Sequence, residues 1–367
     1  MPVVEVSLGA RSYPIHIAAG ALDQAGALIA PRLDGGRVLV IADATVAKLH
    51  GQRLLAALTT AGLDAVIETF PAGEPSKTLA TADALWQACA RHRIDRSGAV
   101  IGLGGGVSGD LTGFVASCWM RGIAFVQVPT SLLAMVDSSV GGKTGVNSAA
   151  GKNLVGAFCQ PRIVVIDPTV VATMDDREYR SGFAEVVKYG VIRSAEFLAW
   201  QEANAAALAA RDPVAVAHAV AESCRIKAWY VAEDEFEQGV RAELNYGHTF
   251  GHALERETKY RVYLHGEAVA IGMGMAANLS HRLGLLDDPG LPDRLAGLLR
   301  RLGLPQRHQS ADPAAEAARL AAHCALDKKV RHGATRFILP RRAGQVELVS
   351  SPPADQVIAA FGSGIAS

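Results

Sequence analysis

The stretch GAVIGLGGGVSGD, residues 98–110, joins a short apolar run to a cluster of glycines. The run Ala99–Leu103 has the length and composition of a buried β-strand. Gly104, Gly106 and Gly109 then satisfy the pattern GxGxxG, which lets backbone N–H groups approach a pyrophosphate at a strand-to-helix turn. The segment predicts a strand, a glycine turn and a helix, and it makes nucleotide binding a hypothesis.

Similar strands lie on both sides of this segment. The candidate strands are RVLVIAD (37–43), DAVIETF (64–70), GAVIGLG (98–104), AFVQVP (124–129) and RIVVID (162–167). Strands that alternate with helical stretches favour a mostly parallel sheet covered on both faces. After about residue 175 the strand signal fades, and Ala/Leu/Arg/Glu-rich segments with helical periodicity follow. We expect an α/β domain over residues 1–175 and an all-α domain over residues 176–367.

Composition limits the classes of partner. The 367 residues include 36 basic and 36 acidic side chains, so no global field attracts nucleic acid or an anionic membrane. No apolar run approaches the roughly 20 residues of a membrane span, and MPVVE does not begin a signal peptide. The five cysteines are an odd number without a CxxC pair, which favours reduced thiols in a cytoplasmic protein.

The glycine motif is unusually placed for a standard dinucleotide fold. It lies about a hundred residues into the chain, and no acidic residue ends a strand about twenty residues later. The better ribose candidate is Asp43, at the end of RVLVIAD. The segment PAGEPSKT adds Glu74 and Lys77, either as a solvated turn or as adenosine and ribose contacts. We therefore predict a Rossmann-like sheet of non-standard strand order.

A second glycine-rich stretch, SVGGKTGVNSAAGKN (139–153), contains two Gly-Lys pairs. The P-loop pattern requires a glycine six positions before its lysine, and that position is Asp137, so the pattern fails. A bare Gly-Lys-Thr usually lies in an ordinary loop. Asp137, Lys143, Lys152 and Asn153 nevertheless occur close together in sequence, and we expect a loop that brings these polar groups to one place.

The segment RAELNYGHTFGHALE (241–255) indicates a polar helix face. At 100° per residue, Arg241, Asn245, His248 and His252 fall within about 60° of one another. A solvated face with two ordinary histidines is the simpler interpretation. The glycines at 247 and 251 count against it, because glycine destabilises an exposed helix and suggests close packing. Histidines at i and i+4 can share one Zn²⁺, although HExxH is absent.

Two further segments offer metal ligands. YLHGEAVA supplies His265, and SGFAEVVKYG supplies Glu185, which shares a helix face with Lys188 at i, i+3. That pair alone is most often a surface ion pair of little energetic worth. Spacing leaves open whether His252 or His265 completes a metal site.

Taken together, the chain resembles the 3-dehydroquinate synthase family of sugar phosphate cyclases, from about residue 35 to 345. Six motifs that carry the resemblance occur in order: GGGVSGDLTGFVAS, RGIAFVQVPTSLLAMVDSSVGGKTGVN, GKNLVGAFCQP, SGFAEVVKYG, LNYGHTFGHALE and LHGEAVAIGM. The resemblance implies a homodimeric carbon–oxygen lyase that converts 3-deoxy-D-arabino-heptulosonate 7-phosphate to 3-dehydroquinate and phosphate, the second step of the shikimate pathway to chorismate and the aromatic amino acids.

The resemblance also implies two cofactors, NAD⁺ and one divalent metal, Zn²⁺ or Co²⁺. NAD⁺ would oxidise carbon 5, phosphate would leave, the same cofactor would return the hydride, and an aldol closure would form the ring. NAD is thus regenerated in each turnover. The metal ligands that the resemblance implies are Glu185, His248 and His265, with His252 moved to the substrate phosphate.

The resemblance implies the remaining site residues as well. Around the substrate phosphate it implies Lys143, Asn153, Asn245 and His252, with Arg121 from a partner subunit. It implies Arg241 and Lys227 at the carboxylate, Asp137 and Lys188 at the hydroxyls near the metal, and Lys152 with Lys328 or Lys329 lining the pocket. The implied NAD⁺ contacts are Asp43, Glu74, Lys77, Gly104, Gly105, Gly106, Val107, Gly109, Asp110, Thr130, Ser131, Lys143, Lys152 and Thr173.

Three alternatives remain at this point. Another sugar phosphate cyclase would act on a different heptulose or hexose phosphate. A metal-dependent polyol dehydrogenase would release NADH and would not need the many anion-binding cations. A nucleotide-binding regulator would carry a structural metal, but structural zinc usually has four protein ligands and the best set here has three.

Overall fold

The computed structural model describes residues 2–325 and 335–367. The chain divides into two compact units, residues 1–175 with 216–236, and residues 176–215 with 237–367. Residues 216–236, which we expected in the C-terminal domain, thus pack with the first unit. They form most of helix α8 (Pro213–Glu233), and the Cys224 thiol donates to the Met135 carbonyl of that unit at 3.3 Å.

The first unit is built on a seven-stranded sheet in the order β1-β2-β9-β6-β5-β3-β4. The strands are β1 (Val3–Val6), β2 (Tyr13–Ile17), β3 (Arg37–Asp43), β4 (Asp64–Phe70), β5 (Ala99–Gly104), β6 (Ala124–Pro129) and β9 (Val164–Ile166). All pairs are parallel except β1 with β2. The predicted mostly parallel sheet is confirmed.

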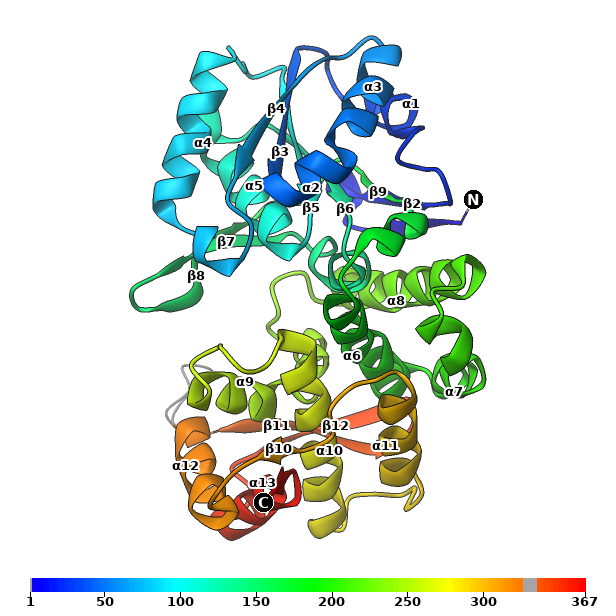
Figure 1. Cartoon of the computed structure of the whole chain (residues 1–367), viewed down its shortest axis with the longest axis vertical. Coiled ribbons are helices and arrows are strands. Elements are labelled where there is room, and N and C mark those ends of the chain that lie inside the picture. Colours follow the sequence, from blue (N-terminus) through cyan, green and yellow to red (C-terminus); the bar gives the residue numbers. More distant parts are fainter. Residues whose placement is uncertain (1, 326–334) are drawn as a thin grey trace. The chain divides into compact units, whose positions relative to one another are not determined.

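Helices cover both faces of this sheet. They are α1 (Ala25–Ile29), α2 (Ala44–Val46), α3 (Gln52–Thr60), α4 (Leu79–Arg91) and α5 (Gly106–Cys118). Figure 1 shows α4 and α5 on one side of the strands and α1 and α3 on the other. Strands covered in this way are buried on both faces, which explains why β3 and β5 read as continuous apolar runs.

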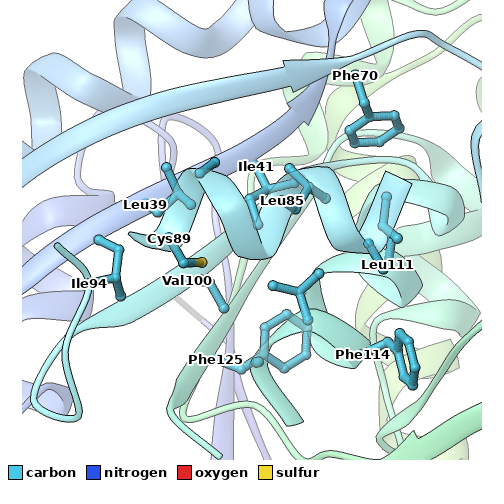
Figure 2. Close-up of a cluster of buried hydrophobic side chains, with 14 of the residues drawn as sticks. Leu39, Ile41, Phe70, Leu85, Cys89, Ile94, Val100, Leu111, Phe114 and Phe125 are labelled. Atoms are coloured by element: carbon cyan, nitrogen blue, oxygen red, sulfur yellow. The ribbon is translucent and has the colours of Figure 1, made fainter. Parts of the chain in front are cut away.

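The core beneath α4 and α5 fixes the position of the glycine turn. Leu39 and Ile41 of β3 and Val100 of β5 belong to one buried cluster with Leu85 of α4 and Leu111 of α5 (Figure 2). Each large apolar side chain buried in this way stabilises the fold by about 1.5–3 kcal/mol. The carboxyl ends of β3 and β5 are thereby held rigidly beside the start of α5.

The strand order places these carboxyl ends at a switch point. From β3 the chain moves to β4 on one side and then returns to β5 on the other side of β3. Counted from β3, the parallel strands β4-β3-β5-β6-β9 follow the order 2-1-3-4-5 rather than the 3-2-1-4-5-6 of the standard dinucleotide fold. Ligands of open α/β sheets bind where the strand order reverses.

The second unit is mainly helical. Its helices are α6 (Asp176–Arg193), α7 (Ala195–Ala209), α9 (His248–Glu257), α10 (His265–Arg282), α11 (Leu291–Arg301), α12 (Pro313–Ala325) and α13 (Ala354–Ser363). The helical C-terminal part is confirmed. The domain is not all-α, however, because it also contains two small sheets, β10 (His308–Gln309) with β13 (Ile365–Ala366), and β11 (Arg336–Arg342) with β12 (Gln345–Ser350).

Two general expectations concern membranes and thiols. Across residues 2–325 and 335–367, no helix combines the length and the apolar character needed to cross a membrane. Within the same ranges, none of the five cysteines forms a disulfide.

Candidate active site

In the first unit, the glycine turn lies directly after β5. Gly104 has a φ of +149°, and a Cβ atom there would lie 2.3 Å from the Ser108 hydroxyl oxygen, so only glycine fits. Gly105 is the N-cap of α5, whose first turn leaves backbone N–H groups without helical acceptors. The turn therefore has the geometry of an anion site at a helix N-terminus.

Asp43 lies at the same switch point. Its Oδ1 accepts from the backbone N–H groups of Thr45 and Val46, both at 2.9 Å, and so caps α2. Its Oδ2 points towards the turn, 3.5 Å from the position of a Cβ atom at Gly104. One carboxylate oxygen is thus committed to the fold, and the other faces the glycine turn.

Two other cofactor candidates of this unit, Thr130 and Ser131, lie beside the turn. The Thr130 N–H donates to the Gly104 carbonyl at 2.9 Å, and Ser131 Oγ lies 3.3 Å from a Cβ atom built at Gly105. Val107, Gly109 and Asp110 lie on α5 itself. Thr173 ends a 3-10 helix (Pro168–Thr173), and its hydroxyl lies 2.9 Å from His50 Nε2.

The turn with Glu74 and Lys77 is joined to a hairpin rather than solvated. Asn147 Nδ2 donates to Glu74 at 2.7 Å, and the Asn147 N–H donates to the Lys77 carbonyl at 2.8 Å. Lys77, only 4% exposed, forms an ion pair with Asp110 and donates to Asn153 Oδ1 at 2.6 Å. This role of Asn147 is not predictable from the sequence, because nothing in its local sequence indicates a partner about seventy residues away.

The pKa of the Asp110 carboxyl group is raised above its usual value. Burial raises the pKa of its carboxyl group, and the charge and hydrogen bond of Lys77 oppose that rise. The ion pair is thus what keeps a carboxylate in this position beside α5.

The expected glycine-rich loop at 139–153 is in fact mostly a β-hairpin, of β7 (Lys143–Ser148) and β8 (Gly151–Phe158). The glycines permit close pairing: a Cβ atom at Gly156 would lie 2.1 Å from the Thr144 carbonyl oxygen. Lys143 pairs with Phe158 at one end, whereas Lys152 follows Gly151 at the other. At the rise of a strand, this separates the two lysine backbones by about 15 Å. The two Gly-Lys pairs therefore lie near opposite ends of the hairpin.

Three further candidates belong to the first unit. Asp137 lies on a short π-helix (Ala134–Ser138), and Lys227 of α8 donates to both its Oδ1 and its carbonyl oxygen at 2.5 Å. These two residues, predicted to contact different parts of a substrate, thus form one partly buried ion pair. Arg121 is exposed, with a φ of +67° beside Gly122.

In the second unit, the predicted continuous helix over 241–255 is wrong. A 3-10 helix (Val240–Asn245) ends before Gly247, which has a φ of +79°, and α9 begins at His248. Glycine is required there, because a Cβ atom would lie 2.7 Å from Met273 Cγ. Arg241 and Asn245 therefore do not share a regular helix face with His248 and His252.

The close packing inferred from the glycines does occur, between α9 and α10. A Cβ atom at Gly272 would lie 2.2 Å from the Gly247 carbonyl, and one at Gly251 would lie 3.0 Å from the Ala268 carbonyl. The approach of these backbones brings the first turn of α9, with His248, next to the first turn of α10, with His265. Their imidazole centroids are 5.2 Å apart.

Glu185 and Lys188 do not form the surface pair that their spacing suggested. They lie in the middle of α6, 0% and 1% exposed, and Lys188 Nζ contacts Glu185 Oε2. Almost every residue of α6 from Tyr179 to Ile192 is buried, so both sides of the helix face protein. A buried carboxylate requires cationic partners.

The opposite oxygen of Glu185 faces two imidazoles. Its Oε1 lies 3.5 Å from His248 Nε2 and 3.7 Å from His265 Nε2. Ligand atoms bound to one tetrahedral Zn²⁺ at about 2.0–2.2 Å are separated by about 3.4 Å. The donor set and its spacing therefore fit a divalent metal, and three protein ligands leave a position open, as in catalytic sites.

The outer nitrogens of both imidazoles are also held. His248 Nδ1 lies 3.1 Å from the Tyr246 carbonyl, and His265 Nδ1 lies 3.5 Å from Glu255 Oε1. Burial lowers the pKa of the His265 imidazole, but Glu185 and Glu255 outweigh burial and raise it to about 10. Two carboxylates around one ring thus favour a cation at this position.

The remaining candidates of this unit lie nearby in the chain. His252 belongs to a second group of ligand-type side chains, with Glu255 and His265, and not to the group around Glu185. Asn245 Nδ2 donates to Glu237 Oε1 at 2.8 Å, and Arg241 is 1% exposed. Glu237 and Glu255 are not predicted from the sequence, although the i, i+3 spacing of His252 and Glu255 is a signal that they could interact. Lys328 and Lys329 lie outside the described residues.

The fold and these groups define a class: a two-unit protein with a nucleotide-type turn at the switch point of an α/β sheet and a metal-type cluster in a helical unit. The family models of the 3-dehydroquinate synthase N-terminal and C-terminal regions match residues 67–181 and 182–330. The chain belongs to the 3-dehydroquinate synthase family, and it is an enzyme.

Relatives and a solved structure agree with this assignment. The 3-dehydroquinate synthase of Halorhodospira halophila is 52% identical, over 92% of this chain and 93% of the relative. That of Rhodospirillum rubrum is 51% identical, over 99% of this chain and 95% of the relative. The structure of ValA, a 2-epi-5-epi-valiolone synthase from Streptomyces hygroscopicus with NAD⁺ and Zn²⁺ bound, is 30% identical with a TM-score of 0.85, covering 97% of this chain and 98% of that one.

Proposed function

We propose that the chain is a 3-dehydroquinate synthase, which converts 3-deoxy-D-arabino-heptulosonate 7-phosphate to 3-dehydroquinate and phosphate. The observation that carries the proposal is the cluster of His248 and His265 around the buried Glu185, with Lys188 on the other side of the carboxylate, in a chain of this family. Lys188 provides a cation directly beside the position at which a substrate hydroxyl would meet the metal.

The cofactors that fit are NAD⁺ and one divalent metal, the pair bound in the ValA structure. When bound, NAD⁺ supplies a hydride acceptor and donor, and the metal polarises the hydroxyl that is oxidised. We assign nucleotide binding to residues 1–175, where Asp43 and the turn at Gly104 lie at the switch point. We assign metal binding and part of substrate binding to residues 176–367, with Arg121, Asp137, Lys143, Lys152 and Asn153 of residues 1–175 as further substrate contacts.

The cations of both units suit a substrate with a phosphate and a carboxylate, because such anions require several charge-assisted hydrogen bonds. For the phosphate we propose Lys143, Asn153, Asn245 and His252, and for the carboxylate Arg241 and Lys227. Asp137 and Lys188 would contact the hydroxyls, with Lys152 nearby. We further propose a cytoplasmic homodimer in which the exposed Arg121 of one subunit reaches the phosphate site of its partner.

No residue of this set is a convincing general base for the proton next to carbon 5. His252 beside a phosphate dianion would be protonated, because a nearby opposite charge favours the charged imidazole. We propose that the phosphate of the substrate itself accepts this proton and that the lysines hold the phosphate over that carbon. Correct placement of a reacting group supplies much of a rate enhancement.

Lys143→Ala tests this placement. Loss of one charge-assisted hydrogen bond is expected to weaken binding of a non-eliminating phosphonate analogue by about 10- to 100-fold and to slow exchange of that proton with solvent. NAD⁺ affinity should stay nearly unchanged, because Lys143 lies at the far end of the hairpin from the Glu74–Lys77 turn. Calorimetry measures both affinities, with Lys259→Ala, an exposed lysine without an assigned role, as control. A loss confined to NAD⁺ affinity would reassign Lys143 to the nucleotide.

The function itself is tested by measuring whether NAD⁺ is consumed or regenerated during turnover. With the heptulosonate phosphate, NAD⁺ and Zn²⁺, the protein should release phosphate and 3-dehydroquinate in equal amounts without net NADH, because the hydride is returned. Phosphate assay, product absorbance and NADH absorbance are followed in one reaction. Accumulation of NADH in step with product would instead indicate a polyol dehydrogenase.

A further inference from the structure

The two imidazoles at the metal cluster differ in what holds their outer nitrogen. The outer nitrogen of His248, Nδ1, lies 3.1 Å from a neutral group, the backbone carbonyl of Tyr246. The outer nitrogen of His265, Nδ1, lies 3.5 Å from a carboxylate oxygen, Glu255 Oε1. Metal-bound histidines commonly donate their second N–H to a carboxylate or a carbonyl, which fixes the tautomer and makes the ring a stronger ligand.

Glu255 lies where such a group must lie. It occupies the last turn of α9, whereas His265 begins α10, so the contact joins two helices that the glycines hold together. Glu255 is 6% exposed, and burial strengthens the interaction of its carboxylate with a neighbouring imidazole ring. Glu185 meets His265 from the other side, at Nε2, so the two carboxylates contact different nitrogens of one ring.

We propose that Glu255 is a positioning residue for the metal site: it accepts the Nδ1–H of His265, holds the ring with Nε2 towards Glu185 and His248, and strengthens Nε2 as a donor. This rests on the proposed metal site. The competing arrangement is a second metal held by His252, Glu255 and His265, whose ligand atoms also lie within 4.8 Å of one another. A single His265 ring cannot keep a proton on Nδ1 and bind a metal there.

Metal affinity is the direct test, because it does not require turnover. Full-length wild type, Glu255→Gln, Glu255→Ala and Glu257→Gln are titrated with Zn²⁺ against a competing chelator. Glu257 is the matched control: it is two residues further along α9 and pairs with Arg319 at 3.2 Å instead of with the cluster. Glu255→Gln should bind Zn²⁺ about 10-fold more weakly and Glu255→Ala up to about 100-fold more weakly, while the control stays at the wild-type value.

Two further measurements separate positioning from a merely structural role. Co²⁺-loaded Glu255→Gln should show a changed visible spectrum, because the donor strength of His265 falls, and the metal-free Glu255 and Glu257 variants should unfold at similar temperatures. Wild-type Zn²⁺ affinity in Glu255→Gln, or a fall in melting temperature with unchanged affinity, overturns the proposal. So does binding of two metal ions per wild-type chain. Failure of the wild type to bind any metal would overturn the metal site itself as well.

Discussion

Replacement of Glu185, His248 or His265 by alanine is expected to abolish turnover and to remove the bound metal. Each change deletes one of three donors around a single position, at Oε1 or at an Nε2 within 3.7 Å of it. The loss should exceed the about 10- to 100-fold that follows changes to outer contacts of a metal site. Elemental analysis of the purified variants, together with phosphate release, measures both effects.

His252→Ala provides the discriminating comparison on the same helix. Its imidazole is 5.4 Å from that of His248, centroid to centroid, yet it does not belong to the group around Glu185. The variant should keep its metal and bind substrate poorly, because its imidazole is assigned to the phosphate. If His252→Ala loses zinc while His265→Ala retains it, the ligand assignment is wrong.

Much of the α/β unit was predictable from sequence because its information is local. The runs at Arg37–Asp43 and Ala99–Gly104 are apolar over their whole length, which is how strands buried on both faces appear. The glycine turn follows from Gly104, where backbone conformation admits little else. Even the non-standard strand order was indicated, by the late position of the glycines and by an acidic residue upstream of them.

The metal-type cluster was predictable only as a set of residue types. Regular 100° spacing placed Arg241 and Asn245 on the face of His248, but Gly247 ends that regularity in a left-handed conformation. Periodicity assumes one unbroken helix, and a single positive φ invalidates it. The choice between His252 and His265 depends on how α9 packs on α10, which no local pattern contains.

The burial of charged side chains could not be predicted from the sequence either. Glu185 and Lys188 have the spacing of a common solvated pair, and only the packing around α6 makes them a buried one. Lys77 is a similar case, because its partners Asp110 and Asn153 come from α5 and from the hairpin. Ion pairs between distant segments leave no periodic signal.

Lys77→Met is expected to destabilise the protein by about 3–5 kcal/mol, since removal of one partner of a buried ion pair leaves an uncompensated charge. The Lys77 side chain is 5% exposed, and the Asp110 side chain is 18% exposed. The same change deletes the 2.6 Å hydrogen bond to Asn153 and so detaches the hairpin from the Glu74–Lys77 turn. NAD⁺ affinity should fall with it. Urea unfolding gives the stability, and calorimetry gives the affinity.

The pH dependence of this loss identifies its cause. Burial already raises the pKa of Asp110, and Lys77 opposes that rise, so the methionine variant should have a still higher pKa. A group with a raised pKa contributes stability at low pH that is lost as pH rises through the folded pKa. The deficit of Lys77→Met should therefore be small at about pH 4 and large at about pH 8. Lys77→Met/Asp110→Asn, which has no carboxylate to neutralise, should regain most of the stability and lose the pH dependence. A double variant as unstable as Lys77→Met at both pH values would show that the packing of the lysine stem, and not its charge, stabilises this part of the proposed nucleotide site.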